Sequence, residues 1–157
     1  MKKLIVVLFI SLVVLLVSCG GLSELPFVII SEQMLTANDE NPAPKIIVVT
    51  QTPSHIVGIS AEDLSVLLNV DYSKDVAFVI FFDYNNPMIT KISQFKALMG
   101  NLTIWVQANF PTSTTDADFV NYEIVTIKRT QIKGRGKVLV RLLDDSFYEK
   151  NSVSFVN

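Results

Sequence analysis

Acidic side chains are the residues of this chain most suited to chemistry, and they come in close pairs. The pairs are Glu62/Asp63, Asp71/Asp75, Asp116/Asp118 and Asp144/Asp145. Two neighbouring carboxylates can serve as the acid and base of a glycosidase, or they can hold a calcium ion. Short loops between strands also collect aspartate, because its side chain hydrogen-bonds its own backbone. We therefore expect these pairs to stabilise loops rather than to catalyse a reaction.

The side chains that nucleophilic catalysis and zinc binding require are scarce. His55 is the sole histidine and Cys19 the sole cysteine, whereas a structural zinc site uses about four ligands, mainly of these two types. Ser93 and Lys96 fit the Ser-x-x-Lys pattern of penicillin-binding enzymes, but the partner motifs Ser-Asp-Asn and Lys-Thr-Gly are missing from the sequence. We predict that the protein is not an enzyme and that it uses no metal and no cofactor.

Basic residues gather in one stretch, KRTQIKGRGK (128–137). Its charged members are Lys128, Arg129, Lys133, Arg135 and Lys137, which are five of the 11 lysines and arginines that follow residue 18. At the tip of a β-hairpin they can contact anionic lipid head groups, a cell-wall polyanion or an acidic partner. Charges on such a turn also discourage edge-to-edge strand pairing. We treat these five residues as candidate partner contacts.

Two further features are candidate contacts. One is the turn YNNP, formed by Tyr84, Asn85, Asn86 and Pro87, because loops on a rigid β scaffold often carry binding residues. The other is Trp105, the only tryptophan, which lies on the less apolar face of an alternating segment. Its ring either packs against a second sheet or stacks on a bound ligand.

The N-terminus has the layout of an export signal. Met1-Lys2-Lys3 is basic, and the apolar run 4–17 would span about 21 Å as a helix, short of the ~30 Å hydrocarbon core of a bilayer. The run ends in Leu16-Val17-Ser18-Cys19, which resembles the lipobox of bacterial lipoproteins. The resemblance implies cleavage before Cys19 and acylation of its thiol. We then expect a lipid-anchored protein on the extracytoplasmic side of a cell membrane, or in the outer membrane if the host has two membranes.

The remaining 139 residues (157 − 18) suffice for one domain. We expect a signal peptide over 1–18, a lipidated tether over 19–26 and a single domain over 27–157. Beyond residue 18 the chain has 15 acidic and 11 basic residues, so a nucleic-acid partner is not expected. Without a second cysteine, no disulfide within the chain can stabilise the fold.

Hydrophobic patterns in this domain indicate a mainly β protein. Apolar or alternating segments predict strands over 27–30, 45–50, 76–83, 88–95, 102–110, 119–129, 137–143 and 152–157. Residues 60–69 predict the one helix, with Ser60 and Asp63 forming a capping box and Leu64, Leu67 and Leu68 on one face. Seven to eight short strands with one short helix favour a β-sandwich or a partly open barrel.

The segment from Val76 to Arg129 resembles the C-terminal domain of the PrcB-type lipoproteins, which are accessory subunits of a surface protease complex. The matching pieces are VAFVIFFD, YNNP, LTIWVQANFP and NYEIVTIKR, with Tyr122 and Val125 in the places of a Tyr-x-x-Val strand motif. The resemblance implies a non-enzymatic role with an exported protein, a protease, as partner. The alternatives are a lipoprotein that binds carbohydrate or cell-wall polymer through Trp105, and an enzyme that uses an acidic pair.

Overall fold

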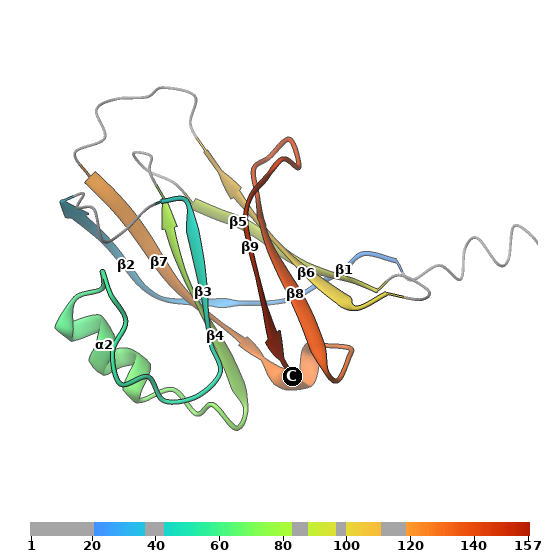
Figure 1. Cartoon of the computed structure of the whole chain (residues 1–157), viewed down its shortest axis with the longest axis horizontal. Helices are drawn as coiled ribbons and strands as arrows, with labels where there is room; N and C mark the ends of the chain where they lie inside the picture. The colour runs from blue at the N-terminus through green and yellow to red at the C-terminus, as the bar shows by residue number, and fades with distance from the viewer. Residues whose placement is uncertain (1–20, 37–42, 83–87, 97–99, 111–118) are drawn as a thin grey trace, which may run out of the picture.

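The computed structural model describes residues 21–36, 43–82, 88–96, 100–110 and 119–157, which form two β-sheets and one short α-helix (Figure 1). The strands are β1 (Ser23–Glu24), β2 (Val28–Thr36), β3 (Lys45–Val49), β4 (Asp75–Phe82), β5 (Met88–Lys96), β6 (Leu102–Asn109), β7 (Phe119–Lys128), β8 (Lys137–Leu143) and β9 (Glu149–Val156). The α-helix is α2 (Ala61–Leu68), and a 3-10 turn, η1 (Arg129–Gln131), follows β7.

The strands form a five-stranded sheet, β1-β5-β6-β8-β9, and a four-stranded sheet, β2-β7-β4-β3. The sheets are not closed into a barrel, so the predicted mainly β fold is confirmed with an open architecture of two sheets. The described residues contain nine strands, where seven to eight were expected. The additional strand is β1, which has only two residues and therefore carries no alternation that could be recognised in the sequence.

The central strand β4 is buried on both faces, as its continuous apolar run predicted. Val76, Phe78, Ile80 and Phe82 belong to the core between the sheets, and the residues between them belong to a second core beneath α2. All seven residues from Val76 to Phe82 are fully buried. Complete burial of one large apolar side chain contributes roughly 1.5–3 kcal/mol, so β4 supplies a large share of the apolar stabilisation.

Strand β6 confirms the predicted alternation. Leu102, Ile104, Val106 and Ala108 are buried in the core between the sheets, while Thr103, Trp105 and Gln107 lie on the opposite face. β6 pairs antiparallel with β5 and parallel with β8, where Leu102 faces Val138. A parallel pair cannot be joined by a tight turn, and β7, which lies between β6 and β8 in sequence, belongs to the other sheet.

The N-terminal segment changes from one sheet to the other. β1 pairs with β5, and the backbone N–H of Leu25 donates to Ile92 O at 2.8 Å. After Pro26 and Phe27 the chain enters β2, which pairs with β7 in the four-stranded sheet. The predicted strand at 27–30 is thus the start of β2, and Leu25 is 1% exposed, so the segment is fixed to both sheets.

Helix α2 begins where the capping motif predicted, but its buried face differs from the expected one. The Ser60 hydroxyl accepts from the backbone N–H of Asp63 at 3.0 Å. The expected apolar face is wrong in part, because Leu68 is 49% exposed and Leu64 is only half-buried, whereas Asp63 and Leu67 are buried. Residues four apart share a face of a helix, and the sheet offers a polar partner to Asp63.

Candidate interaction surface

Three aromatic side chains meet on the outer face of the five-stranded sheet, and we call them the aromatic face: Phe95, Trp105 and Phe147. Phe95 and Trp105 are stacked with ring centroids 6.1 Å apart, and Phe147 meets Trp105 edge-on at 6.2 Å. Trp105 does not pack against the four-stranded sheet, because its neighbours Ile104 and Val106 occupy the inner face. Such ring pairs contribute about 0.5–1.5 kcal/mol beyond the area that they bury.

The β8–β9 turn holds Phe147 in an unusual conformation. Its φ is 64°, a left-handed value that glycine or asparagine normally occupies. The Asp144 carboxylate maintains the turn by accepting from the backbone N–H groups of Ser146 and Tyr148, both at 2.9 Å. A phenylalanine in this conformation costs about 1 kcal/mol or more. The turn nevertheless presents Phe147 at 58% and Tyr148 at 70% exposure, an arrangement typical of a contact surface.

Charged pairs border the aromatic face on both sides. Arg141, the cross-strand neighbour of Trp105 on β8, forms an ion pair with Glu149 at 3.4 Å, and Lys91 forms one with Glu24 at 3.6 Å. All four side chains are at least two-fifths exposed, so these pairs add little stability. A centre of aromatic rings with a charged rim is the composition that protein–protein interfaces favour.

The predicted basic cluster is divided by the fold. The expected hairpin at 128–137 is wrong, because β7 and β8 belong to different sheets and the segment crosses between them. A hairpin requires two strands that pair with each other, and β7 instead pairs with β2 and β4.

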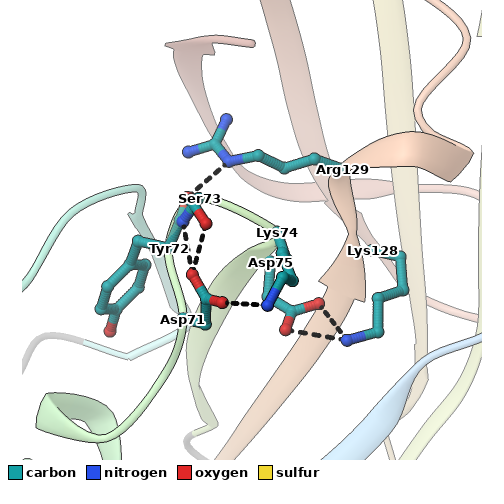
Figure 2. A network of polar contacts seen from close by, with 7 residues as sticks. All are labelled: Asp71, Tyr72, Ser73, Lys74, Asp75, Lys128 and Arg129. Carbon is teal, nitrogen blue, oxygen red and sulfur yellow. Dashed lines mark hydrogen bonds and ion pairs between the residues drawn. The ribbon is translucent and has the colours of Figure 1, made fainter.

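Lys128 and Arg129 are engaged in internal contacts. The Lys128 ammonium forms an ion pair with Asp75 at 2.8 Å, and the Arg129 guanidinium donates to Tyr72 O at 2.9 Å (Figure 2). Arg129 also donates to Thr50 O at 3.0 Å and to Asn157 Oδ1 at 3.2 Å. One guanidinium therefore connects three segments that are far apart in the sequence. Lys133, Arg135 and Lys137 are exposed, as Lys128 is, whereas Arg129 is half-buried.

Two of the acidic pairs have structural partners that the loop interpretation predicted. Asp71 accepts from Ser73 and forms an ion pair with Lys74 at 2.7 Å (Figure 2). The hydrogen bond from Lys74, followed by that from Ser73, lowers the pKa of Asp71 to about 2. Asp144 performs the corresponding role in the β8–β9 turn. Asp116 and Asp118 lie outside the described residues.

Asp63 is an exception among the acids, because it is buried and has partners from three segments. It accepts hydrogen bonds from the hydroxyls of Ser31 on β2 and Tyr122 on β7, and from Ser60 at 2.8 Å. The backbone N–H of Ser60 in turn donates to the Tyr122 hydroxyl at 3.1 Å. Burial alone would raise the pKa of Asp63, but the three hydroxyl donors outweigh burial and lower it. The network attaches α2 to the sheet.

Glu123 is a buried carboxyl that the sequence analysis missed. It lies on β7 opposite Glu32 of β2, is 5% exposed, and accepts from the backbone N–H of Ile89 at 3.3 Å. Burial raises the pKa of Glu123 to about 7, the Ile89 hydrogen bond opposes this shift, and the Glu32 carboxylate adds to it. Alternation could have located it, because Glu123 has the same parity as the inward residues Val125 and Ile127.

His55 is exposed on the wall of a hollow of about 370 Å³ that the contiguous segment 47–56 lines. The lining contains no carboxylate that could orient the imidazole as a triad does. Within the described residues, no group of three or more histidine, cysteine, aspartate or glutamate side chains has an arrangement that could hold a metal ion. The same part of the chain contains no helix long and apolar enough to cross a bilayer.

Two of the predicted sites cannot be placed. Cys19 and the turn Tyr84–Pro87 lie outside the described residues. Compared with protein-family models, curated proteins and solved structures, the chain matches none of them. The lipobox and the PrcB-like pattern are therefore supported by the sequence alone. The aromatic face is supported by the geometry of the structure.

Proposed function

We propose that this chain is a membrane-anchored lipoprotein without enzymatic activity whose β domain binds another exported protein and stabilises or positions it. The anchor is Cys19, at the end of the lipobox. The resemblance to PrcB-type lipoproteins suggests a protease as the partner. The observation that carries the binding part of the proposal is the aromatic face, extended by the exposed Phe147 and Tyr148 of the β8–β9 turn.

The aromatic face supports a protein partner for energetic reasons. Isolated exposed apolar residues are ordinary on a protein surface. Contiguous aromatic rings instead form an apolar patch that water solvates poorly. Binding a partner would remove these rings from water, and truncation of an aromatic residue that is a hot spot of an interface costs about 2 kcal/mol or more of binding free energy. A rigid turn lowers the entropy lost on association.

Crosslinking on intact cells, followed by purification of the lipidated protein, tests the proposal. We expect one dominant exported partner, and we expect the double variant Trp105→Ala/Phe147→Ala to lose it. Met34→Ala/Leu68→Ala is the matched control, because these two side chains are 61% and 49% exposed but belong to the other sheet and the helix. Recovery of no protein above background, or equal recovery with both variants, would contradict the proposal.

Carbohydrate binding is a second candidate, because the half-buried Trp105 faces outward between Thr103 and Gln107 on β6. A sugar-stacking ring needs one open face, and Phe95 and Phe147 already occupy two sides of this indole. A titration with soluble cell-wall oligosaccharides decides between the two candidates, since Trp105 is the only tryptophan. We expect no shift of its fluorescence, and a saturable shift would favour the sugar.

A further inference from the structure

Four exposed basic residues lie at one end of the five-stranded sheet, and we call them the basic end: Lys96, Lys133, Arg135 and Lys137. Lys96 ends β5 and Lys137 begins β8, while Lys133 and Arg135 lie in the connection that precedes β8. Sequence proximity explains only three of these positions. Lys96 joins them because β6 pairs with both β5 and β8.

Strand register shows that the basic end is also the end at which the N-terminal segment enters the domain. Ser23 of β1 faces Gln94 of β5, Lys96 faces Leu102 of β6, and Leu102 faces Val138 of β8. Ser23 and Gln94 belong to the row of Ile104 and Val140, and Lys96, Leu102 and Val138 form the neighbouring row, two residues closer to the basic end. Because β1 is antiparallel to β5, Gly21 and Leu22 precede Ser23 in the direction of Lys96 and the basic end.

Gln94 connects the N-terminal strand to the basic segment directly. Its side chain is 3% exposed and donates from Nε2 to Ser23 Oγ at 3.1 Å and to Gln131 O at 2.8 Å. Its Oε1 accepts from the backbone N–H of Lys133 at 2.8 Å. Gly134 packs against β6 so closely that an added Cβ would lie 3.2 Å from Leu102 Cδ2. The basic segment is thus held in place beside β1.

Charge is distributed unevenly along the same sheet. Asp144, Asp145 and Glu149 lie at or beside the β8–β9 turn, which is the opposite end from Lys137. Other acids also have cationic partners: Glu24, in the middle of the sheet, pairs with Lys91, Asp75 pairs with Lys128, and Asp71 pairs with Lys74. Asp144 and Glu149 at the turn are likewise paired, with Lys150 and Arg141. The positive charges of the basic end, unpaired among the described residues, would therefore be attracted to an anionic surface more strongly than the turn end.

The spacing of the anchor selects a membrane as this anionic surface. Cys19 precedes Ser23 by four residues, so at about 3.5 Å per residue the chain between them spans at most about 14 Å. A lipid on Cys19 would therefore keep β1, and the basic end beside it, within about 14 Å of the head groups. This step rests on the proposed function, because it requires the lipid anchor.

We propose that Lys96, Lys133, Arg135 and Lys137 contact anionic phospholipid head groups of the membrane that holds the anchor. The contact fixes the domain with its basic end toward the bilayer and directs the β8–β9 turn, with Phe147 and Tyr148, away from it. Each basic residue that reaches an anionic surface strengthens binding by about fivefold at moderate salt. Screening by salt weakens the contact, because the groups are exposed.

Lysine labelling of the lipidated full protein in vesicles tests this inference with controls in the same molecule. The vesicles contain either phosphatidylcholine alone or phosphatidylcholine with phosphatidylglycerol, and an amine-reactive ester is followed by mass spectrometry. We expect Lys96, Lys133 and Lys137 to react at least about fivefold more slowly on the anionic vesicles, and the protection to disappear in 1 M salt. Lys45, Lys91 and Lys150, which lie nearer the opposite end, should react equally on both vesicles.

A variant pair strengthens the test. Lys133→Gln/Arg135→Gln/Lys137→Gln should remove most of the protection of Lys96, whereas the matched control Lys45→Gln/Lys91→Gln/Lys150→Gln should retain it. Tryptophan fluorescence of Trp105 checks that both variants are folded. Equal labelling of Lys96, Lys133 and Lys137 on the two kinds of vesicle overturns the inference. So does protection of these lysines by soluble poly(glycerol phosphate) but not by anionic vesicles, which would assign the surface to a cell-wall polyanion.

The same mass spectra separate this inference from the proposed function. If the spectra show no lipid on Cys19, both the proposed anchor and the proposed membrane contact are wrong. If Cys19 carries a lipid but the lysines are not protected, the anchor is supported and only the proposed contact of the basic end with the membrane is wrong.

Discussion

The Arg129 side chain connects three segments that are far apart in the sequence. Its three hydrogen bonds go to Thr50 after β3, Tyr72 before β4 and Asn157 after β9, and its backbone N–H donates to Lys74 O at 2.8 Å. A guanidinium has a fixed planar arrangement of donors, which an ammonium group cannot reproduce. Lys128, one residue earlier, has a side chain that is 59% exposed and a single partner among the described contacts, Asp75.

Substitution of Arg129 should therefore lower the free energy of unfolding more than substitution of Lys128. Arg129→Lys should lower the free energy of unfolding by about 2 kcal/mol, because it leaves carbonyl oxygens at Thr50 and Tyr72 without their charged donor. Lys128→Gln should lower it less, by about 1 kcal/mol, because the lysine side chain is 59% exposed and the glutamine can still donate to Asp75, whose side chain is 15% exposed. Urea denaturation of both variants measures the difference, and equal losses would show that Arg129 does not hold the three segments together.

The raised pKa of Glu123 predicts that the protein loses stability as the pH rises toward neutrality. Glu123 has a pKa of about 7 in the folded protein and near 4.5 in the unfolded chain, so the folded state binds its proton more tightly. Its contribution to stability is complete below pH 4.5 and is lost as the pH rises to about 7, by roughly 2–3 kcal/mol. Glu123→Gln, which keeps an acceptor for Ile89 N–H, should remove this loss.

Urea denaturation at pH 5 and pH 8 provides the measurement. The variant should be more stable than the wild type at pH 8 and similar to it at pH 5. Glu32→Gln is the control, because it removes only the neighbouring charge that adds to the raised pKa of Glu123. A wild type whose stability at pH 8 is not lower than that of the variant would contradict the buried position of Glu123.

At the scale of elements, helix α2 shows how a short helix is held without a wide apolar face. Leu67 is its fully buried leucine, and Asp63 supplies the second contact through hydroxyls from two strands and the cap. An eight-residue helix is unstable in isolation, so these tertiary contacts determine whether it forms. The carboxylate makes the attachment of α2 sensitive to acid.

Asp63→Asn should destabilise the protein by about 2–3 kcal/mol near neutral pH, because charge-assisted hydrogen bonds in a buried site are lost. The folded pKa of Asp63 is lowered from 3.8, so its contribution is present above the unfolded value and disappears as the pH falls through the folded value. Urea denaturation between pH 3 and pH 7 measures it. Glu62→Gln is the matched control, since Glu62 is exposed and should change stability little at any pH.

At the scale of the whole molecule, the five-stranded sheet separates two surfaces. The basic end lies at the starts of β6 and β8, while Phe147 and Tyr148 lie beyond the end of β8. Of the aromatic face, only Phe95 lies beside the basic end, next to Lys96. A sheet is stiff along its strands, so one end can face a membrane while the other remains accessible. The proposed contacts with lipid and with a protein partner would then be independent.

This separation predicts that substitutions at one surface do not affect the other. Trp105→Ala/Phe147→Ala should abolish recovery of the partner and leave lysine protection on anionic vesicles unchanged. The triple glutamine variant of Lys133, Arg135 and Lys137 should show the reverse when the two assays are performed on the same preparations. Loss of both properties in either variant would indicate a single shared surface or a misfolded domain.

The sequence by itself determined eight of the nine strands in the described residues and indicated that β4 is buried on both faces. Alternation in β6 and the continuous apolar run in β4 are local properties, because side chains alternate between faces whatever the neighbouring strand is. The start of α2 was equally local, because Ser60 caps the helix through a residue three positions away. The lipobox around Cys19 and the PrcB-like pattern remain predictions from the sequence.

Only the tertiary structure decided which residues meet. The stretch 128–137 reads as a hairpin because its turn residues are the same in a hairpin and in a crossing between sheets. Pairing of β6 with both β5 and β8 placed Lys96 near Lys133 and brought Trp105 near Phe147. Packing of the two sheets placed Arg129 among oxygens of Thr50, Tyr72 and Asn157. Such pairings depend on contacts between residues far apart in the chain, whose energies no local pattern records.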